Sequence, residues 1–553
     1  MNVTDHLEML SAPPATVGRQ ATTSEGEFMA GRLTLSWVNK DQALVSDDQG
    51  GYTWVDRDNP RVTEVRLLHS AGASGDGAPD DNLLIQGDSY DALHALVRIP
   101  EYAKQYRGKV KLVYIDPPFN TGQAFEHYED ALEHSVWLGM MRERLLLIRE
   151  LLAVDGSVWV HLDDAEMAYC RVLMDEIFGR GNFVTSIIWK RRNDPRNTAT
   201  HLSADHDFIL CYTKDLALSS FNQLPRTDEM DAAYTNPDED PRGPWRRGDL
   251  AARNYYSKGL YPITTPSGRR ISGPPSGSFW RVSEEELQRL DADGRIFWGP
   301  DGTSRPYLKR YLSEVKGGRV PSSVWHPEEV GFVRNGKEEV RSLVGDVFAT
   351  PKPERLMQRV IHIATNPGDI VLDCFTGSGT TAAVAHKMGR RWVGVELSES
   401  TFETYTRPRL EKVVCGSDPG GVTKATGWTG GGGFRTMVVG PSLYEYADQR
   451  ILLADWAKGE EFAQAVAAQL GFTYQIEKPF SGIKGRTRLA VVDGVADDVV
   501  VRAIVSHLGE DERVTVIAKA IAPGTADVLK ELSTGSRLLK APRDLVRQGR
   551  VVR

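Results

Sequence analysis

The sequence predicts an α/β fold built on a doubly wound, largely parallel sheet, with a large insert and a smaller C-terminal α/β domain. Three observations predict this arrangement. A strand, a glycine turn and a helix follow one another over residues 369–389, which is the layout of nucleotide-binding α/β folds. A second apolar strand, residues 113–115, ends directly in Asp116-Pro117-Pro118-Phe119. Strand-like and helix-like runs alternate again after residue 434.

The composition is that of an ordinary globular protein. The 553 residues provide room for three or four domains at ~150 residues each, and 41% of them are hydrophobic and 26% charged. No signal peptide and no apolar run of the ~20 residues that span a bilayer is visible, so we expect a cytoplasmic protein. The net charge of −8 argues against a general nucleic-acid coat protein, although phosphate binding depends on where the cations sit. Four scattered cysteines lack metal-ligand spacing, so we expect reduced thiols and no metal site: Cys170, Cys211, Cys374 and Cys415.

The N-terminal third leads into the first half of the sheet domain. Residues 1–80 are expected to form a partly disordered N-terminal segment, because the first ~30 are rich in Pro, Thr and Ser. Residues 81–190 are expected to form the catalytic half of the core. They include a helix over 131–152, whose apolar residues recur on one face. Strand-like runs follow at 158–162, 185–190 and 208–213.

The tetrapeptide Asp116-Pro117-Pro118-Phe119 suits methyl transfer to an exocyclic amino nitrogen. The amino group of adenine is a weak nucleophile because its lone pair is delocalised into the ring. The Asp116 carboxylate and the Pro117 carbonyl can each accept one amino hydrogen, which frees the lone pair for attack. Consecutive prolines fix φ and remove backbone donors, so Pro117 and Pro118 leave carbonyls facing the site. Phe119 offers a ring on which a base extruded from a duplex can stack. The alternative is a strand that ends in an ordinary Pro-rich turn.

A glycine-rich turn is the second chemical motif. The run Asp373-Cys374-Phe375-Thr376-Gly377-Ser378-Gly379-Thr380-Thr381 lies between a strand at 369–372 and a helix at 382–389. Glycines let the backbone approach a ligand closely, and the helix N-terminus favours an anionic group. The next strand, 391–395, ends in Glu396, where a carboxylate can hold ribose hydroxyls. The loop is not the G-x-G-x-x-G of dinucleotide enzymes, and beside the Asp116 motif it indicates S-adenosylmethionine as the cofactor.

With its catalytic motif placed before its cofactor loop, the chain resembles the amino-specific DNA methyltransferases of the beta class. The resemblance implies a Rossmann-like, S-adenosylmethionine-dependent methyltransferase core with permuted motif order. In this family an Asp at the first position of the motif, as at Asp116, is typical of N6-adenine enzymes, whereas N4-cytosine enzymes usually carry Ser. The resemblance therefore implies N6-methylation of adenine in a specific duplex sequence, with N4-methylation of cytosine as the alternative.

Further stretches narrow the resemblance to the modification subunits of type III restriction-modification systems and their solitary relatives. Residues 83–88 are similar to the family's strand before the catalytic strand, which implies that Asp88 lies near the cofactor's adenine. Residues 350–356 are similar to its TPKP element, which implies that Lys352 walls the cofactor pocket. The resemblance also implies a homodimer that acts on double-stranded DNA, with any nuclease and ATPase on a separate restriction subunit. The implied cofactor-binding residues are Asp88, Lys352, Asp373, Phe375, Gly377, Gly379, Thr380 and Glu396.

Residues 191–345 separate the two motif-bearing halves, and we expect them to form a target-recognition domain. Pro, Gly and Arg are frequent there, and aromatic residues lie among the arginines. This composition is typical of a surface that reads DNA by stacking, bidentate contacts and phosphate anchoring, although a loop-rich domain with a small aromatic core has it too. The predicted DNA contacts are Lys190, Arg191, Arg192, Arg246, Arg247, Arg269 and Arg270, and Lys309-Arg310 is a further basic pair.

The remaining segments complete the expected organisation. Residues 346–415 are expected to be the cofactor-binding half of the core, and residues 416–433 a glycine-rich linker. Residues 434–553 contain no catalytic constellation, so we expect a small α/β domain for dimer or partner contact. Its expected strands are 488–492, 514–518 and 538–540, and its expected helices are 497–508 and 526–532.

Three other functions fit the sequence less well. A complete restriction-modification enzyme needs an ATPase motor, but no G-x-x-x-x-G-K-[ST] loop occurs. A catalytically silent DNA-binding subunit would be free to lose Asp116, Phe119, Asp373 and Glu396, all of which are present. A protein-glutamine methyltransferase would carry Asn in place of Asp116 and would have no need of an insert as large as 191–345.

Overall fold

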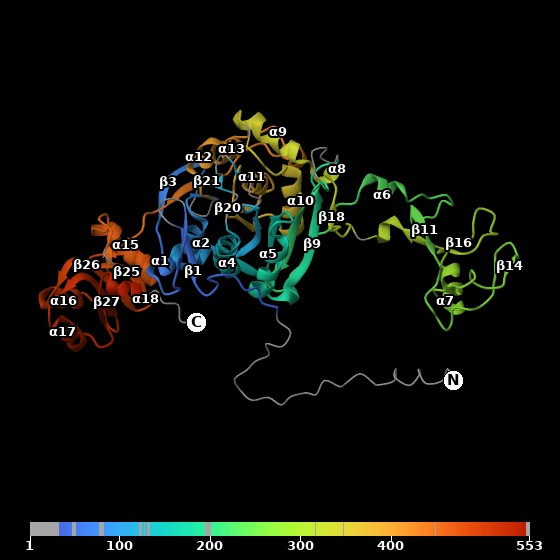
Figure 1. The fold of residues 1–553 in the computed structure, drawn as a ribbon. Coiled ribbons are helices and arrows are strands. Elements are labelled where there is room, and N and C mark those ends of the chain that lie inside the picture. The colour runs from blue at the N-terminus through green and yellow to red at the C-terminus, as the bar shows by residue number, and fades with distance from the viewer. Residues whose placement is uncertain are drawn as a thin grey trace, which may run out of the picture.

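The computed structural model describes residues 33–548 apart from 47–50, 77–81, 121–123, 126–127, 130–132, 194–200, 316, 347 and 448–449. A ten-stranded sheet with helices on both faces forms the core, with the insert at one end and the C-terminal domain at the other (Figure 1). The disorder expected for the first residues falls on 1–32, which lie outside the described residues. None of the described helices is long and apolar enough to cross a membrane.

The central sheet has the strand order β18-β9-β10-β8-β5-β19-β20-β4-β21-β3. The strands from β8 to β21 run parallel, whereas β10 and β3 are antiparallel to their neighbours. This arrangement confirms the predicted α/β fold class. The strands are β3 (Leu68–Gly75), β4 (Asn82–Gln86), β5 (Val110–Ile115), β8 (Leu152–Leu162), β9 (Phe183–Lys190), β10 (His206–Thr213), β18 (Val324–Trp325), β19 (Ile370–Asp373), β20 (Arg391–Glu396) and β21 (Gly433–Val439).

Helices cover both faces of this sheet because its central strands are apolar on both sides. In β5, for example, Val113 and Ile115 pack into one core cluster while Leu112 and Tyr114 pack into the other. The first cluster contains α2 (Ser89–Arg98), α3 (Pro100–Tyr106), α4 (His134–Leu151) and α5 (Met167–Met174). The second contains α8 (Pro327–Val330), α10 (Glu354–Ala364), α11 (Thr380–Lys387) and α13 (Arg407–Val414).

The strand order reverses between β5 and β19, which pair in the middle of the sheet. From β19 the chain passes through α11 to β20 on one side, and from β5 it passes through α4 to β8 on the other. In open parallel sheets, ligands bind at such a switch point, outside the carboxyl ends of the strands. Asp116 follows β5 and Asp373 ends β19, so both predicted motifs meet at this point.

The insert is shorter than the predicted range of 191–345. Strand β10 lies within that range but pairs with both β8 and β9, and β18 pairs with β9. The body apart from the sheet comprises about residues 225–318, because Leu224 and Arg319 still pair beside the core. Its elements are α6 (Asp228–Ala232), β11 (Trp245–Asp249), β12 (Ala251–Ala252), β13 (Ile263–Thr264), β14 (Arg270–Ile271), β15 (Phe279–Trp280), α7 (Glu284–Ala292), β16 (Ile296–Phe297) and β17 (Tyr307–Tyr311).

Two other predicted boundaries also shift. Strands β3 and β21 pair with each other in the central sheet, so residues 68–75 and 433–439 belong to the core. The glycine-rich stretch 416–433 is packed against the core, since Val422 N donates to Glu354 Oε2 at 2.9 Å and Trp428 Nε1 to the Val413 carbonyl at 2.8 Å. It is therefore a fixed connector and not a free hinge.

The C-terminal domain has its own five-stranded sheet, in the order β24-β25-β26-β27-β28, with helices packed on it (Figure 1). Gln469 links it to the core by accepting from Val65 N at 2.9 Å. Its elements are α15 (Gly459–Leu470), β24 (Thr473–Glu477), β25 (Phe480–Lys484), β26 (Thr487–Ala496), α16 (Asp498–Val505), β27 (Arg513–Ile521), α17 (Thr525–Leu532), β28 (Arg537–Lys540) and α18 (Arg543–Gln548).

Candidate active site

A cavity of about 670 Å³ lies at the switch point of the sheet. Its volume is in the range of small-molecule sites. The two motifs that are 250 residues apart in the chain share its wall, because the ends of β5, β19 and β20 are adjacent. Of the predicted catalytic and cofactor residues, Asp116, Pro118, Lys352, Asp373, Phe375, Gly377, Thr380 and Glu396 line it.

One oxygen of the Asp116 carboxylate is paired with a cation, and the other has no hydrogen-bond partner among the described residues. Lys352 Nζ forms an ion pair with Oδ2. Oδ1 is buried and has no hydrogen-bond partner among the described residues. Lys352 thus holds the carboxylate in place through Oδ2 and leaves Oδ1 as an acceptor without a partner among the described residues. Its ammonium also lies 5.2 Å from the centre of the Phe119 ring, a cation–π distance.

Phe119 rests on a buried polar chain that the sequence analysis did not single out. Its ring stacks on His161 with centroids 5.9 Å apart and planes at 24°. His161 Nδ1 lies 2.7 Å from Tyr114 Oη, and its Nε2 lies 3.3 Å from Asp207 Oδ2. Burial and the nearby Lys352 charge lower the pKa of His161, so a neutral ring accepts from Tyr114 and donates to Asp207. This series of hydrogen-bonded side chains fixes the position of the ring on which a base would stack.

Two buried carboxylates face the cofactor side of the cavity. Glu396 is held by two backbone donors, Gly377 N at 2.8 Å from Oε2 and Ser398 N at 2.9 Å from Oε1. Asp373 Oδ1 accepts from Phe375 N at 3.0 Å. Burial, reinforced by other carboxylates nearby, raises the pKa of Asp373 to about 7 and that of Glu396 to about 7. Both groups therefore sit near the midpoint of ionisation at neutral pH.

Two of the predicted cofactor residues, Asp88 and Gly379, are not among the residues that line the cavity. Asp88 caps α2 by accepting from Tyr90 N at 2.6 Å, and it pairs with Arg144 Nη2 at 2.9 and 3.0 Å. Its oxygens are thus already engaged, and Arg144 lines the cavity in its place. Gly379 is the N-cap of α11 and faces Thr406, since a Cβ there would lie 3.5 Å from Thr406 Cγ2. Other lining residues that the sequence analysis missed are Tyr52, Ser89, Met140, Phe348 and Leu397.

Only two residues of the catalytic tetrapeptide, Asp116 and Pro118, line the cavity. Pro118 lines the cavity, and its carbonyl accepts from Trp137 Nε1 at 2.7 Å, so one of its two lone pairs is engaged. Pro117 is buried, and neither Pro117 nor Phe119 is part of the cavity lining. The ring of Phe119 therefore lies outside the cavity lining, next to Pro118.

The predicted DNA contacts fall into two groups. Lys190, Arg191 and Arg192 follow or end β9 in the core, and Arg191 Nη1 is paired with Asp207 Oδ1 at 2.8 Å. The other four lie in the insert and are exposed, and Arg269 donates to the Thr303 carbonyl at 3.2 Å. The structure therefore does not bring the seven residues into one patch. The four insert residues are Arg246, Arg247, Arg269 and Arg270.

Comparison with known proteins shows what the chain is related to. A family model described as DNA methylase matches residues 110–407, more than half of the chain and both motifs. The chain belongs to this family. It is 34% identical over 334 residues to the type III restriction-modification enzyme StyLTI Mod subunit of Salmonella typhimurium, covering 54% of this chain and 49% of the relative. It is 32% identical over 312 residues to the type II methyltransferase M.EcaI of Enterobacter cloacae, covering 54% and 64%.

These matches confirm the resemblance to DNA methyltransferases of the Mod type. The chain spans about half to two thirds of the length of these two relatives. Among solved structures, the PvuII DNA methyltransferase (cytosine-N4-specific) is 16% identical with a TM-score of 0.33, over 61% of this chain and 89% of that one.

Proposed function

We propose that this member of the DNA methylase family transfers a methyl group from S-adenosylmethionine to the N6 amino group of adenine in a specific double-stranded sequence. The observation that carries the proposal is the shared cavity. It joins a carboxylate with one open oxygen, at Asp116, to the glycine loop and Glu396. The family membership, and the similarity to a Mod subunit and a type II methyltransferase, support it.

The cavity residues fit S-adenosylmethionine. Glu396 is oriented by two backbone donors, so its carboxylate can accept hydrogen bonds from ribose hydroxyls. Asp373 places a second carboxylate in the same cavity, where a positively charged ligand would be favoured. When bound, the cofactor supplies an electrophilic methyl group on a sulfonium centre.

The chain's own residues prepare the amino group. Asp116 Oδ1 accepts one amino hydrogen, while the ion pair with Lys352 holds the carboxylate in position. Phe119, supported by His161, stacks on the extruded base. The amino nitrogen would take the methyl group that the bound cofactor supplies, and the amino hydrogen accepted by Asp116 would leave as the proton.

Gly377→Val is expected to weaken S-adenosylmethionine binding about tenfold or more. Gly377 lines the cavity with a φ of 51°, a left-handed conformation that a β-branched residue adopts only at a cost. Gly389→Val is the matched control, because Gly389 has a φ of 69° with nothing within 4 Å and lies outside the cavity lining. Calorimetry that gives both variants the same affinity as the parent would contradict the assignment.

Cofactor affinity is expected to rise about tenfold between pH 6 and pH 8. Because the pKa values of Asp373 and Glu396 are each raised to about 7, both groups are mostly protonated at pH 6 and mostly ionised at pH 8. Only the ionised forms attract the cofactor's positive charge, so binding near neutral pH should release protons. Titration calorimetry across this pH range measures the change in affinity. Glu396→Gln should remove the part of the pH dependence that comes from Glu396. An affinity independent of pH in the parent would be inconsistent with these roles.

The proposal extends to partners. Double-stranded DNA is the substrate, a homodimer is the working unit, and the cytoplasm is the location. A separate restriction subunit is a further partner, by analogy with the Mod subunit named above. Incubating the purified chain with S-adenosylmethionine and unmodified DNA, followed by mass spectrometry of the digested nucleosides, tests the reaction. N6-methyladenine is the expected product. N4-methylcytosine would overturn the adenine assignment and leave the family unchanged.

A further inference from the structure

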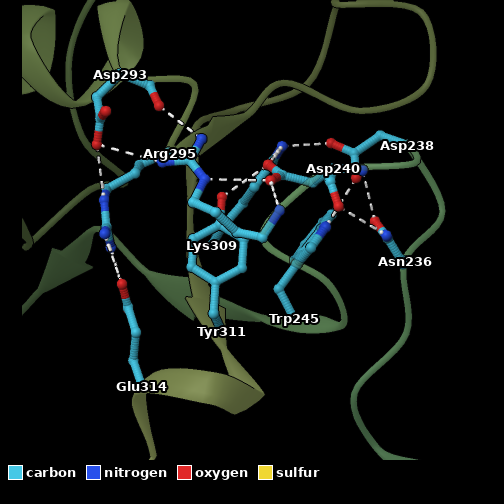
Figure 2. Close-up of polar contacts among 10 residues, drawn as sticks. Asn236, Asp238, Asp240, Trp245, Asp293, Arg295, Lys309, Tyr311 and Glu314 are labelled. Carbon is cyan, nitrogen blue, oxygen red and sulfur yellow. Dashed lines mark hydrogen bonds and ion pairs between the residues drawn. The ribbon is translucent and has the colours of Figure 1, made fainter.

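The three-stranded sheet β11-β17-β16 of the insert carries two kinds of cation. The first kind forms ion pairs with carboxylates of the insert itself (Figure 2). Lys309 on β17 is buried, with Nζ 2.5 Å from Asp238 Oδ2 and 2.7 Å from Asp240 Oδ2. Arg242 lies 3.2 Å from Asp240 Oδ1, and Arg295 pairs with Asp293 at 2.8 Å and with Glu314 at 2.5 Å. These cations hold the insert together and are not available to a ligand.

The second kind is exposed and consists of Arg246, Arg247 and Arg310. Within the part of the chain that the structure describes, no ion pair is formed by any of the three. Arg246 and Arg310 are direct partners in the antiparallel β11–β17 register, so their side chains share one face. Like charges directly opposite each other destabilise a sheet, so this pair of arginines is unfavourable for the strand pairing itself.

Gly248 provides the space in which one of these side chains lies. A Cβ built on Gly248 would come 2.7 Å from Arg310 Nε and 3.2 Å from its Cδ and Cγ. The backbone of Gly248 is not left-handed, so its conformation does not require glycine. A side chain at position 248 would instead displace Arg310, which lies across Gly248.

We propose that Arg246 and Arg310 together clamp one backbone phosphate of duplex DNA, with the β11–β17 pair lying against the duplex. This inference rests on the proposed function, because it assumes a DNA substrate. The register places Arg246 and Arg310 on one face, and a planar guanidinium can donate bidentate hydrogen bonds to a phosphate. The ion pair between Lys309 and Asp240 holds β17 in place, and β17 pairs in register with β11 beneath the two arginines.

Salt-dependent binding of the full chain to fluorescent duplexes tests the clamp. Arg246→Gln/Arg310→Gln is expected to weaken binding about tenfold on target and unrelated duplexes alike, since a phosphate carries no sequence information. The slope of log affinity against log salt should become shallower by about 0.9, the value for one phosphate contact. Gly248→Ala removes no charge but displaces Arg310, and should weaken binding on both duplexes to a smaller extent. Arg289→Gln is the control, because Arg289 is exposed and paired with Glu286 in the same insert.

Two outcomes would overturn the clamp. An unchanged salt slope in the double variant would show that the pair contacts no phosphate. A loss confined to the target duplex would show a base contact instead. Unchanged cofactor affinity and thermal unfolding check that the variants are folded. If the parent chain itself neither binds nor methylates DNA, the proposed function fails; if the parent binds and the variants match it, only the clamp fails.

Discussion

Asp116→Ala is expected to slow methyl transfer about a thousandfold while changing S-adenosylmethionine affinity by no more than about twofold. The substitution removes the open Oδ1 that accepts an amino hydrogen, and it leaves the glycine loop and Glu396 untouched. Single-turnover transfer to duplex DNA measures the rate, and calorimetry measures the affinity. A rate loss with intact cofactor binding would place Asp116 at the amino group.

Two further variants separate chemistry from folding. Asp116→Asn keeps the shape of the side chain and should still lose most of the rate, because it weakens the ion pair with Lys352 and the acceptor. Asp164→Ala is the surface control, since Asp164 is exposed and outside the cavity lining. An Asp116→Ala enzyme that retains more than about a tenth of the parent rate would contradict the assigned role.

Exchanging the insert, about residues 225–318, for that of a relative with another target should change the methylated sequence and spare cofactor affinity. The insert forms a body of its own beside the core (Figure 1). None of the insert residues that the structure describes lines the cofactor cavity. Discrimination of about 1–3 kcal/mol per good base contact makes the expected change of target large. Sequencing of the modified DNA reads the outcome.

The exchange has a clear contrary result. If the chimaera still methylates the original sequence, recognition lies outside the insert, and the C-terminal domain is the next place to test. The junctions matter here. An exchange of 191–345 would also replace β10 and β18, which are strands of the central sheet, so the fold itself would be disturbed.

The sequence predicted the site well where a strand end fixes a side chain. Asp116, Asp373 and Glu396 each end or follow a parallel strand, and their motifs placed them at strand ends. They converge because β5, β19 and β20 are adjacent and parallel, which places their carboxyl ends at one edge of the sheet.

Residues that depend on side-chain direction were harder to predict. Asp88 was expected at the cofactor, but its oxygens cap α2 and pair with Arg144, which reaches the cavity from α4. A charged residue among apolar helix positions was the available signal for Arg144. His161 lies in a strand-like run without any motif around it, and only its contacts reveal that it supports Phe119.

Which basic residues of the insert are exposed also depends on side-chain direction. Lys309 and Arg310 form one basic pair in the sequence, yet neighbouring residues of a strand point to opposite faces. Lys309 is buried between two carboxylates, whereas Arg310 is exposed beside Arg246. The boundaries of the insert were misplaced for a related reason. Composition does not separate β10 and β18 from the loops between them, and only strand pairing does.

Sequencing of modified bases in the genomes of cells with and without this chain tests the central claim most directly. We expect N6-methyladenine at one specific DNA sequence in cells that carry the chain. The same sequence should be unmodified in cells that lack the chain and in cells that carry the Asp116→Ala variant. Identical modification patterns in the cells with and without the chain, or N4-methylcytosine at the dependent sequence, would contradict this claim.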